Sequence, residues 1–500
     1  MARNHVLSLD EGTSSCRSIV FDAGGSKCAV SQLEFTQHFP KPGWVEHDPE
    51  EIWQKQLATI RAAMSEARVG VDDIAGIGIT NQRETIVVWD RSTGVPIHPA
   101  IVWQDRRTSD VTERLRAEGR EEDVRGRTGL VLDPYFSGTK IQWILDHVPG
   151  ARARASRGEL AVGTIDCWIV WKLTGGRVHA TDASNACRTL LWNLHTADWD
   201  EELLRMFEVP REMLPEVVTS SGVIAETDPE LLGRPLPIAG IAGDQQAALF
   251  GQLCNRDGMA KNTYGTGCFM LMHTGNEPKP SPSRMLTTVA WRIGDAPLEY
   301  ALEGSVFIAG AAIQWLRDGL KIIDSAPQVN ELAASVEVPG GVFVVPAFAG
   351  LGAPHWDPRA RAAILGLTRG STDAHVALAT LRSLAYRSRD ILDCMVCDSG
   401  IRIEQLRVDG GACVSDLLMQ FQADILGVPV ARPHMVESTA IGAAYLAGLG
   451  VGLWNDLEDL ETHHEIERVF EPQMSESERE RLMRWWRKAV ERTLDWAEED

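Results

Sequence analysis

The sequence predicts two related α/β domains that meet at a cleft. Its 500 residues exceed the length at which a single hydrophobic core stops growing. Apolar runs of strand length alternate with helical patterns along the chain. A strand, a Gly-Thr turn and a returning strand occupy residues 7–14, and the same order returns at residues 261–267. We therefore expect one Gly-Thr hairpin in each domain, with the two hairpins facing each other across the cleft.

The first half opens with a predicted strand meander. Apolar runs at residues 6–9, 17–21 and 28–34 are separated by turn signals. A helical pattern begins at Pro49, and a strand-like run follows at residues 74–79. Strands then alternate with helices, which is typical of a mixed α/β domain.

The second half repeats this order after residue 250. Strand-like runs at residues 259–264 and 268–272 flank the turn at residues 265–267. The other expected elements are a helix near residues 306–316, a strand at 342–345, a helix through 377–392, a strand at 406–408 and a helix at 415–426.

The end of the chain holds two more predicted helices. The apolar stretch at residues 439–454 is rich in Gly and Ala and shorter than the roughly 20 residues that a bilayer needs, which favours a buried helix. Residues 476–500 form a charged amphipathic pattern, which we expect to dock through Trp485, Trp486 and Trp496. The expected division is a first domain at 1–252, a second at 253–447 and a helical appendage at 448–500.

Composition excludes several classes of function. The net charge of −21, without a local basic stripe, argues against nucleic acid as a partner. The first ten residues have too few apolar side chains for a signal peptide, so we expect a cytoplasmic protein without stable membrane insertion. Nine scattered cysteines suit a reducing compartment, and the isolated Cys394–Cys397 pair favours neither a zinc nor a redox site.

Three Gly-rich strand ends are candidates for nucleotide binding. The chain has neither a Walker A loop nor a Gly-x-Gly-x-x-Gly string. At the first hairpin, Asp10 offers a carboxylate for hydrated magnesium, Gly12 permits close backbone approach and Arg17 adds positive charge. The strings Gly-Thr-Gly at 265–267 and Asp-Gly-Gly at 409–411 supply further backbone amides and open space. Each string alone is also ordinary turn chemistry, but together and in this order they favour ATP.

These motifs resemble the phosphate and adenosine motifs of the superfamily that contains sugar kinases, heat-shock proteins and actin. Longer strings at residues 41–49, 78–85, 133–140 and 243–247 are similar to those of the glycerol-phosphorylating members of the FGGY carbohydrate kinase family. The resemblance runs from about residue 6 to about residue 455. It implies two ribonuclease-H-like domains around an ATP and substrate cleft. It also implies phosphorylation of glycerol to sn-glycerol 3-phosphate with ATP and magnesium.

The candidate polyol residues also suit a triol on chemical grounds. Arg83 donates hydrogen bonds, Glu84 accepts them, and Tyr135 can do both. Trp103 and Phe269 can cover the carbon atoms. From the residues alone, Arg83 and Glu84 are interpreted as a surface ion pair, and Trp103 and Phe269 as ordinary core residues. The resemblance implies instead that these four residues and Tyr135 bind the polyol, together with Asp244 and Gln245.

Asp244 follows an apolar run at residues 238–242 and precedes a helical pattern at 245–253. Its carboxylate therefore lies at a positive helix end, where it is expected to stay ionised and can also act as a helix cap. The resemblance implies that it is the general base that takes the proton of the attacking hydroxyl.

The resemblance also implies a set of ATP contacts and a magnesium site. Magnesium would be held near Asp10 and Asp244 through water. Ser415 departs from the family pattern, because many relatives have Asn there. The implied ATP contacts are Thr13, Ser14, Ser15, Arg17, Thr266, Gly310, Gln314, Gly411 and Ser415.

The family context leaves several alternatives open. The acceptor can be another polyol or ketose, such as xylulose, ribulose or gluconate, or the chain can be an ATP-binding regulatory protein without catalysis. The segment at residues 228–235 lacks the paired glycines and the His found in regulated relatives, so we expect weak or absent inhibition by fructose 1,6-bisphosphate and no activation by histidine phosphorylation. Relatives suggest a homodimer or homotetramer. Because both hairpins must reach one ATP, domain closure is expected.

Overall fold

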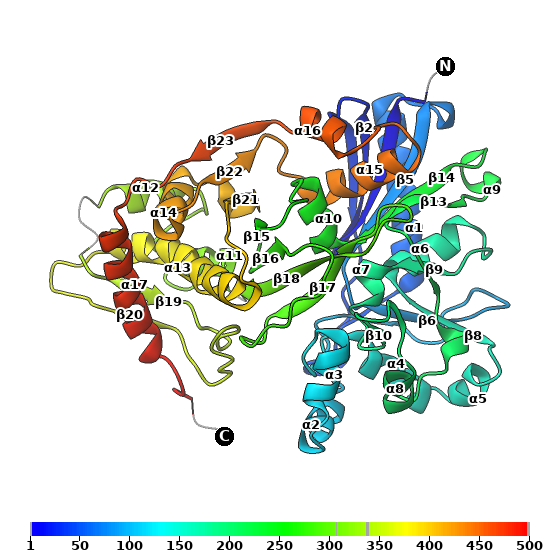
Figure 1. The fold of residues 1–500 in the computed structure, drawn as a ribbon, viewed down its shortest axis with the longest axis horizontal. Coiled ribbons are helices and arrows are strands. Elements are labelled where there is room, and N and C mark those ends of the chain that lie inside the picture. The colour runs from blue at the N-terminus through cyan, green and yellow to red at the C-terminus, as the bar shows by residue number, and fades with distance from the viewer. Residues whose placement is uncertain (1–2, 307, 337–339, 498–500) are drawn as a thin grey trace.

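The computed structural model describes residues 3–306, 308–336 and 340–497. Two mixed β-sheets, one from each half of the chain, are flanked by helices (Figure 1). Within those residues, no helix is both long and apolar enough to cross a membrane. The mixed α/β architecture predicted from the sequence is therefore confirmed.

The first sheet has six strands in the order β13-β14-β5-β1-β2-β3. The three N-terminal strands form the predicted antiparallel meander, and β5 and β14 run parallel to β1. β13 closes the other edge in the antiparallel direction. The bounds are β1 (His5–Glu11), β2 (Ser15–Asp22), β3 (Lys27–Glu34), β5 (Ile74–Asn81), β13 (Ser221–Glu226) and β14 (Pro237–Gly243).

The second sheet repeats this succession in the order β17-β18-β16-β15-β21-β22-β23. An antiparallel meander of β15, β16 and β18 is again followed by two parallel strands and an antiparallel edge strand, and β17 is the addition. The two domains are thus related in topology. The bounds are β15 (Met259–Tyr264), β16 (Cys268–His273), β17 (Leu286–Trp291), β18 (Glu299–Val306), β21 (Gln405–Gly410), β22 (Val430–Pro433) and β23 (Ile466–Phe470).

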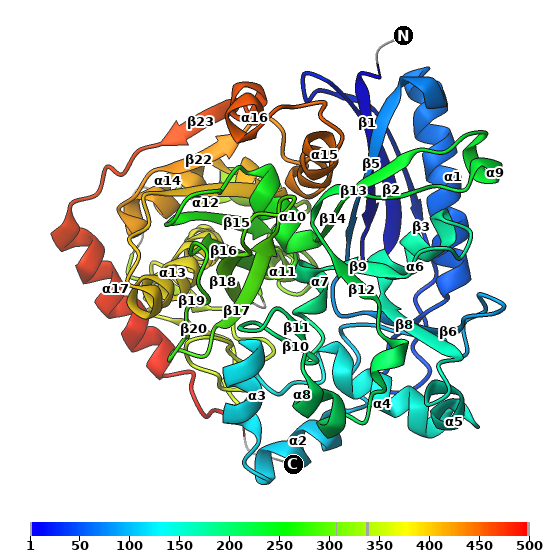
Figure 2. The ribbon, with the colours of Figure 1, turned by 45° about the vertical axis from the view of Figure 1, so that its right-hand side comes forward.

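Two helices cross between the sheets. α15 (Ser438–Gly450) lies in sequence between β22 and β23 of the second sheet but packs on β1, β5 and β14 of the first. α10 (Asp244–Gly251) crosses α15 and also contacts β15 and β16 (Figure 2). Glycine makes the packing possible, because a Cβ on Gly78 would lie 2.0 Å from the Ala443 carbonyl oxygen. The apolar stretch at residues 439–454 thus forms the predicted buried helix as far as Gly450, and residues 451–454 form a turn.

A smaller layer accompanies the first sheet and is formed by β4 and by the part of the chain between β5 and β13. The hairpin of β17 and β18 is anchored in its core, because Leu286 and Val289 pack there and the Tyr300 hydroxyl donates to the Leu194 carbonyl at 2.9 Å. The second domain is thus tied to the first. The elements of the layer are β4 (Glu46–His47), β6 (Ile86–Asp90), β7 (Ala100–Ile101), α2 (Ser109–Ala117), α3 (Glu121–Thr128), α4 (Ser137–His147), α5 (Ala151–Ala155), β8 (Leu160–Thr164), α6 (Ile165–Leu173), β9 (Ala180–Asp182), α7 (Ala183–Ala186), β10 (Trp192–Asn193), β11 (Asp198–Trp199), α8 (Glu201–Met206) and β12 (Glu216–Val218).

The remaining elements cover the outer faces. α1 (Pro49–Ala67) begins at the predicted proline, where the Asp48 side chain accepts from the Glu50 and Glu51 amides. The helix expected near residues 306–316 begins later, at Gly310, because Val306 still belongs to β18; residue 307 lies outside the described residues. The other bounds are α9 (Pro229–Leu232), α11 (Gly310–Asp318), α12 (Gln328–Ala334), β19 (Phe343–Val345), β20 (Ala363–Leu365), α13 (Asp373–Ser399), α14 (Asp416–Leu426), α16 (Leu457–His463) and α17 (Glu476–Glu491).

The C-terminal helix docks differently from the prediction. Trp486 is fully buried and stacks on Tyr386 with ring centroids 5.0 Å apart. Trp485 is 51% exposed and Trp496 is 71% exposed, so the expectation that all three tryptophans dock was wrong. Successive residues on a helix point about 100° apart, so Trp485 cannot share the buried face with Trp486, and Trp496 lies beyond the end of α17.

Candidate functional site

Three parallel strands of the first sheet end at the same edge. In the register of the sheet, Thr80 of β5 pairs with Asp10 of β1 on one side and with Ala242 of β14 on the other. The residues that follow these strands therefore gather at one place, as expected at the carboxyl ends of parallel strands. Asp10, Arg83 and Asp244 are brought to this edge.

The first hairpin, between β1 and β2, is held by side chains on both sides. Arg17 pairs with Asp10 and with Glu437, which precedes α15 and was not predicted as a site residue. The Trp103 indole donates to the Thr13 hydroxyl at 3.0 Å. Ser14 is exposed and the Ser15 hydroxyl accepts from Gln32 at 2.9 Å. The hairpin tip therefore presents hydroxyls toward solvent, and its link to Trp103 connects the predicted phosphate and polyol residues.

Arg83 and Glu84 lie in the turn after β5 and are both buried. Their setting differs from the surface ion pair that the sequence allowed, because Arg83 binds Glu303 and Glu84 binds Arg188. The Arg83 Nη1 and Nη2 atoms lie 2.5 and 3.1 Å from the Glu303 carboxylate oxygens. The Arg188 Nε atom donates to Glu84 Oε1 at 2.6 Å.

Glu303 and Arg188 are therefore site residues that the sequence analysis missed. Glu303 belongs to β18 of the second sheet, and Arg188 follows α7 of the first domain; both side chains are fully buried and lie 3.1 Å apart. Burial alone would raise the pKa of the Glu303 carboxyl, but Arg188 and Arg83 hold it at about 2. The only local signal is a charged residue inside the apolar run of β18.

Tyr135 and Trp103 form the aromatic side of the same cluster. Their ring centroids are 5.6 Å apart in an edge-to-face arrangement. The Arg188 guanidinium lies 5.8 Å from the Tyr135 ring centroid. Burial raises the pKa of the Tyr135 hydroxyl, so that it stays protonated and can donate as well as accept. Phe269 lies half-buried on β16, in the second domain.

Asp244 is the first residue of α10, and the helix cap is Gly243 rather than Asp244 itself. Its Oδ1 atom accepts from the Gln245 amide at 2.7 Å and lies 3.1 Å from Arg83 Nε. Gly243 allows this approach, because a Cβ there would lie 2.7 Å from Arg83 Cδ. The Asp244 side chain is 33% exposed, so it remains reachable by a substrate.

Burial raises the pKa of the Asp244 carboxyl to about 6, and the Arg83 guanidinium opposes that rise. A helix N-terminus alone would instead lower the pKa of this carboxyl. At neutral pH the carboxyl is still mostly ionised, and its basicity is closer to that of a useful general base than that of an ordinary aspartate.

Lys261 is a second residue that the sequence analysis did not single out. This buried lysine on β15 donates to the Thr263 hydroxyl at 2.8 Å and to the Gln245 side chain. Burial lowers the pKa of its ammonium group to about 8, against the pull of Asp409 and Asp244. It links Gln245 at the start of α10 to the strand that leads into the second hairpin.

The second hairpin lies against the start of α11. The Gly310 amide donates to the Gly265 carbonyl at 3.0 Å, and a Cβ on Gly310 would lie 2.6 Å from that oxygen. Thr266 at the tip and Gln314 one turn into the helix are both exposed. The hairpin tip and the helix therefore offer groups to the same region of solvent.

The third Gly-rich segment follows β21. A Cβ on Gly411 would meet no heavy atom within 4 Å among the described residues, which leaves open space there. The Ser415 hydroxyl caps α14 by accepting from the Leu418 amide at 3.2 Å, and it is also bonded to Asn330. An ATP contact by this hydroxyl would have to share it with these two partners.

The acidic residues fit magnesium only as a hydrated ion. Within the described part of the chain, no three His, Cys, Asp or Glu side chains are grouped closely enough to hold a metal by themselves. Asp10 and Asp244 each use one carboxylate oxygen to pair with an arginine, and each has a second oxygen. The Asp244 side chain is 33% exposed and so can be reached by water, and magnesium usually keeps several waters when it is bound.

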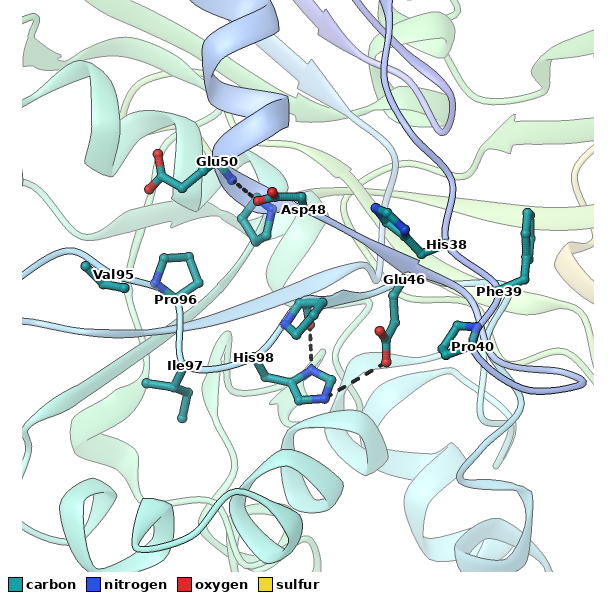
Figure 3. A pocket seen from close by; sticks show the side chains of 12 residues that line it. His38, Phe39, Pro40, Glu46, Asp48, Glu50, Val95, Pro96, Ile97 and His98 are labelled. Atoms are coloured by element: carbon teal, nitrogen blue, oxygen red, sulfur yellow. Dashed lines mark hydrogen bonds and ion pairs between the residues drawn. The ribbon is translucent and has the colours of Figure 1, made fainter.

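A large open cavity lies away from this cluster. It measures about 730 Å³ and is lined by residues 38–40, 46, 48–50 and 95–99, among them His38, Glu46 and His98 (Figure 3). The His98 Nε2 atom lies 4.0 Å from Glu46 Oε1, and Phe39 is 70% exposed. None of the predicted site residues lines it.

Comparisons with known proteins agree with the geometry. The FGGY family of carbohydrate kinases matches over residues 5–251 with its N-terminal domain and over residues 260–451 with its C-terminal domain. Glycerol kinase of Carboxydothermus hydrogenoformans is 59% identical, with 100% of each chain covered. Glycerol kinase of Deinococcus radiodurans is also 59% identical, with 99% of this chain and 98% of the relative covered.

Solved structures are similar over almost the whole chain. The crystal structure of Plasmodium falciparum glycerol kinase with ADP has a TM-score of 0.94 and 35% identity, with 98% of each chain covered. Xylulose kinase of Rhodospirillum rubrum has a TM-score of 0.85 and 25% identity, with 97% of each chain covered. The predicted pair of domains with an actin-like ATPase fold is thus confirmed.

Proposed function

Because the chain belongs to the FGGY family of carbohydrate kinases, we propose that it transfers the γ-phosphoryl group of ATP to glycerol. The observation that carries the proposal is the meeting of Arg83, Glu84 and Asp244 beside two aromatic rings, in a chain 59% identical to glycerol kinases over its full length. A triol needs donors, acceptors and an apolar wall, and this cluster provides all three.

In the proposed reaction, Asp244 accepts the proton of the attacking terminal hydroxyl. Arg83 holds Asp244 by its Nε atom, so the carboxylate keeps one orientation while the other oxygen stays available. Because phosphoryl transfer has a loose transition state, such positioning contributes more than basicity. Hydrated magnesium, held near Asp10 and Asp244, would neutralise charge on the phosphate oxygens.

The ATP site is proposed to be shared by the two domains. Thr13, Ser14, Ser15 and Arg17 of the first hairpin would meet the phosphates from one side, and Thr266, with Gly310 and Gln314 of α11, from the other. Gly411 and Ser415 would border the adenosine. Since the hairpins belong to different sheets, closing the domains around ATP would complete the site and exclude water.

We further propose domains at residues 1–252 and 253–447 with an appendage at 448–500, a cytoplasmic location and a homodimer or homotetramer. The appendage contributes β23 to the second sheet, and α15 packs on the first sheet, so the sequence boundaries do not separate independent folding units. Light scattering at several protein concentrations would determine the oligomeric state.

ADP release by the purified protein with magnesium and ATP tests the function. Glycerol is compared with xylulose, ribulose, gluconate, erythritol and no acceptor. We expect strong turnover with glycerol alone, and its loss in Asp244→Asn. Asp456→Asn is the matched control, because Asp456 caps the distant helix α16 and Asn caps equally well.

If the protein prefers a sugar, it is still a carbohydrate kinase of this family, but glycerol is not its acceptor. ADP release that no acceptor stimulates would instead support an ATP-binding regulatory protein.

A further inference from the structure

Two buried residues outside the predicted polyol set, Arg188 and Glu303, pair with Glu84 and Arg83. We define the buried quartet as Arg83, Glu84, Arg188 and Glu303. All four side chains are at most 2% exposed, and each acid in the quartet lies within 3.1 Å of an arginine of the quartet. We propose that Arg188 and Glu303 are positioning residues that fix the orientation of the polyol-binding groups; this inference rests on the function proposed above.

Glu303 uses both carboxylate oxygens to fix Arg83. Oε2 accepts from Arg83 Nη1 at 2.5 Å, and Oε1 accepts from Arg83 Nη2 at 3.1 Å. This two-point contact sets the plane of the guanidinium as well as its position. Nη1 also donates to Gln246 at 3.2 Å. One N–H of Nη2 is left without a protein partner among the described residues, so it can donate to a hydroxyl of the substrate.

Arg188 binds Glu84 through a single contact. Its Nε atom donates to Glu84 Oε1 at 2.6 Å, while no partner within the described residues binds Glu84 Oε2. Glu84 therefore has one committed oxygen and one that can accept from the substrate. Arg188 also packs over Tyr135, at 5.8 Å from the ring centroid, so it contacts two of the predicted polyol residues.

The backbone at Glu84 strengthens this interpretation. Its φ of 63° lies in the left-handed region, which an L-residue rarely adopts. The Ser137 hydroxyl donates to its carbonyl at 3.0 Å, so the turn is fixed from the other side as well. The backbone and the carboxylate of Glu84 are thus each held by a contact of their own, from Ser137 and from Arg188.

Charge also makes the quartet interdependent. Arg188 bridges Glu84 and Glu303, so removing it leaves one buried carboxylate with no arginine partner at hydrogen-bond distance and another with only Arg83. A buried, unpaired carboxylate takes up a proton or rotates toward water. Either change alters the oxygen that Glu84 offers to the substrate, while the ATP hairpins remain as they are.

Steady-state kinetics of Glu303→Gln and Arg188→Lys tests the proposal. Gln keeps the shape but loses the charge, and Lys keeps the charge but loses the two-sided contact. We expect the KM for glycerol to rise at least about tenfold, while the KM for ATP changes less than about twofold. Glu303→Asp is expected to restore part of the glycerol affinity.

Asp390→Asn is the matched control for the loss of a buried ion pair. Asp390 lies 3.1 Å from Arg387 on α13, and both are at most 9% exposed, but neither belongs to the site. It should lower the melting temperature without changing the KM for glycerol. If Glu303→Gln and Arg188→Lys also only lower the melting temperature, the positioning role is wrong and the quartet is structural.

If one of the two variants, Glu303→Gln or Arg188→Lys, does not fold, the kinetics of the other one tests the proposal. If neither variant folds, the proposal is contradicted, because the removal of a positioning residue should leave the fold intact. Turnover of glycerol by the unsubstituted chain reports on the proposed function by itself. The ratio of KM values between variant and unsubstituted protein reports on the positioning.

Discussion

Gly442 of α15 lies directly against the backbone of Ala247 in α10, so that a Cβ on Gly442 would fall 1.8 Å from the Ala247 carbonyl oxygen. A second close approach joins the same two helices, because a Cβ on Gly251 of α10 would lie 2.1 Å from the carbonyl oxygen of Ser438 in α15. The helix that starts with Asp244 is therefore fixed to the helix that covers the first sheet by a close approach of two backbones.

Gly442→Ala should separate these helices and destabilise the protein. Overpacking of a core typically costs about 1–3 kcal/mol, and backbone atoms cannot move aside as side chains do. Because α10 carries Asp244, activity should fall as well. Chemical denaturation followed by circular dichroism, together with the glycerol assay, measures both effects.

Gly126→Ala is the control for this prediction. Gly126 lies inside helix α3, and a Cβ there would meet no heavy atom within 4 Å among the described residues. Alanine is favoured over glycine in a helix by roughly 0.5–1 kcal/mol. No loss of stability is expected. A stable and active Gly442→Ala protein would show that the helices can move apart.

Trp486 and Trp485 should respond very differently to substitution by alanine. Trp486 is fully buried, stacks on Tyr386 and donates to Asp390 at 2.9 Å. Its removal should cost about 3–5 kcal/mol of unfolding free energy. Trp485 is 51% exposed, so its removal should change stability by no more than about 0.5 kcal/mol. Equal effects in urea denaturation would contradict the observed docking of α17.

Fructose 1,6-bisphosphate should inhibit the enzyme weakly or not at all. The segment that would bind it forms the short helix α9 and lacks the paired glycines of regulated relatives. The glycerol assay is repeated with the bisphosphate at physiological concentration. Fructose 6-phosphate serves as the control for general competition by sugar phosphates. Strong inhibition by the bisphosphate alone would refute the prediction.

Local signals predicted much of the fold. The meander, the two Gly-Thr hairpins and the helix at Pro49 depend on short-range chemistry: turn residues, alternation of apolar side chains and a proline at a helix start. Asp244 was placed at a helix start for the same reason. The family resemblance then added the grouping of residues that are distant in sequence.

The buried quartet could not be predicted in the same way. Arg83 and Glu303 are 220 positions apart, and Arg188 is 115 positions from Glu303. No periodicity relates them; only the packing of the β17–β18 hairpin into the first domain brings them together. The prediction of how α17 docks was wrong for a related reason. An amphipathic pattern indicates that one face of a helix is buried, but it does not determine which of two adjacent tryptophans lies on that face.

The pH dependence of the reaction should follow the raised pKa of Asp244. As general base, this carboxyl must be ionised, and its pKa is about 6. The rate at saturating glycerol and magnesium-ATP should therefore fall as the pH drops below about 6, whereas an aspartate at its ordinary pKa of 3.8 would keep the rate constant there. A rate that is unchanged down to pH 5 would contradict the assignment.

The contribution of the Asp244 carboxyl to stability should fall as the pH rises, whereas the reaction rate should increase. Because folding raises its pKa, the protonated form is favoured in the folded state; the stabilisation is complete below about pH 3.8 and is lost as the pH rises through about 6. At pH 8 the unsubstituted protein therefore bears the cost of a charged, partly desolvated group. Asp244→Asn removes this charge, so it should be inactive yet at least as stable in thermal denaturation at pH 8. A variant that is less stable than the unsubstituted protein at pH 8 would contradict this prediction.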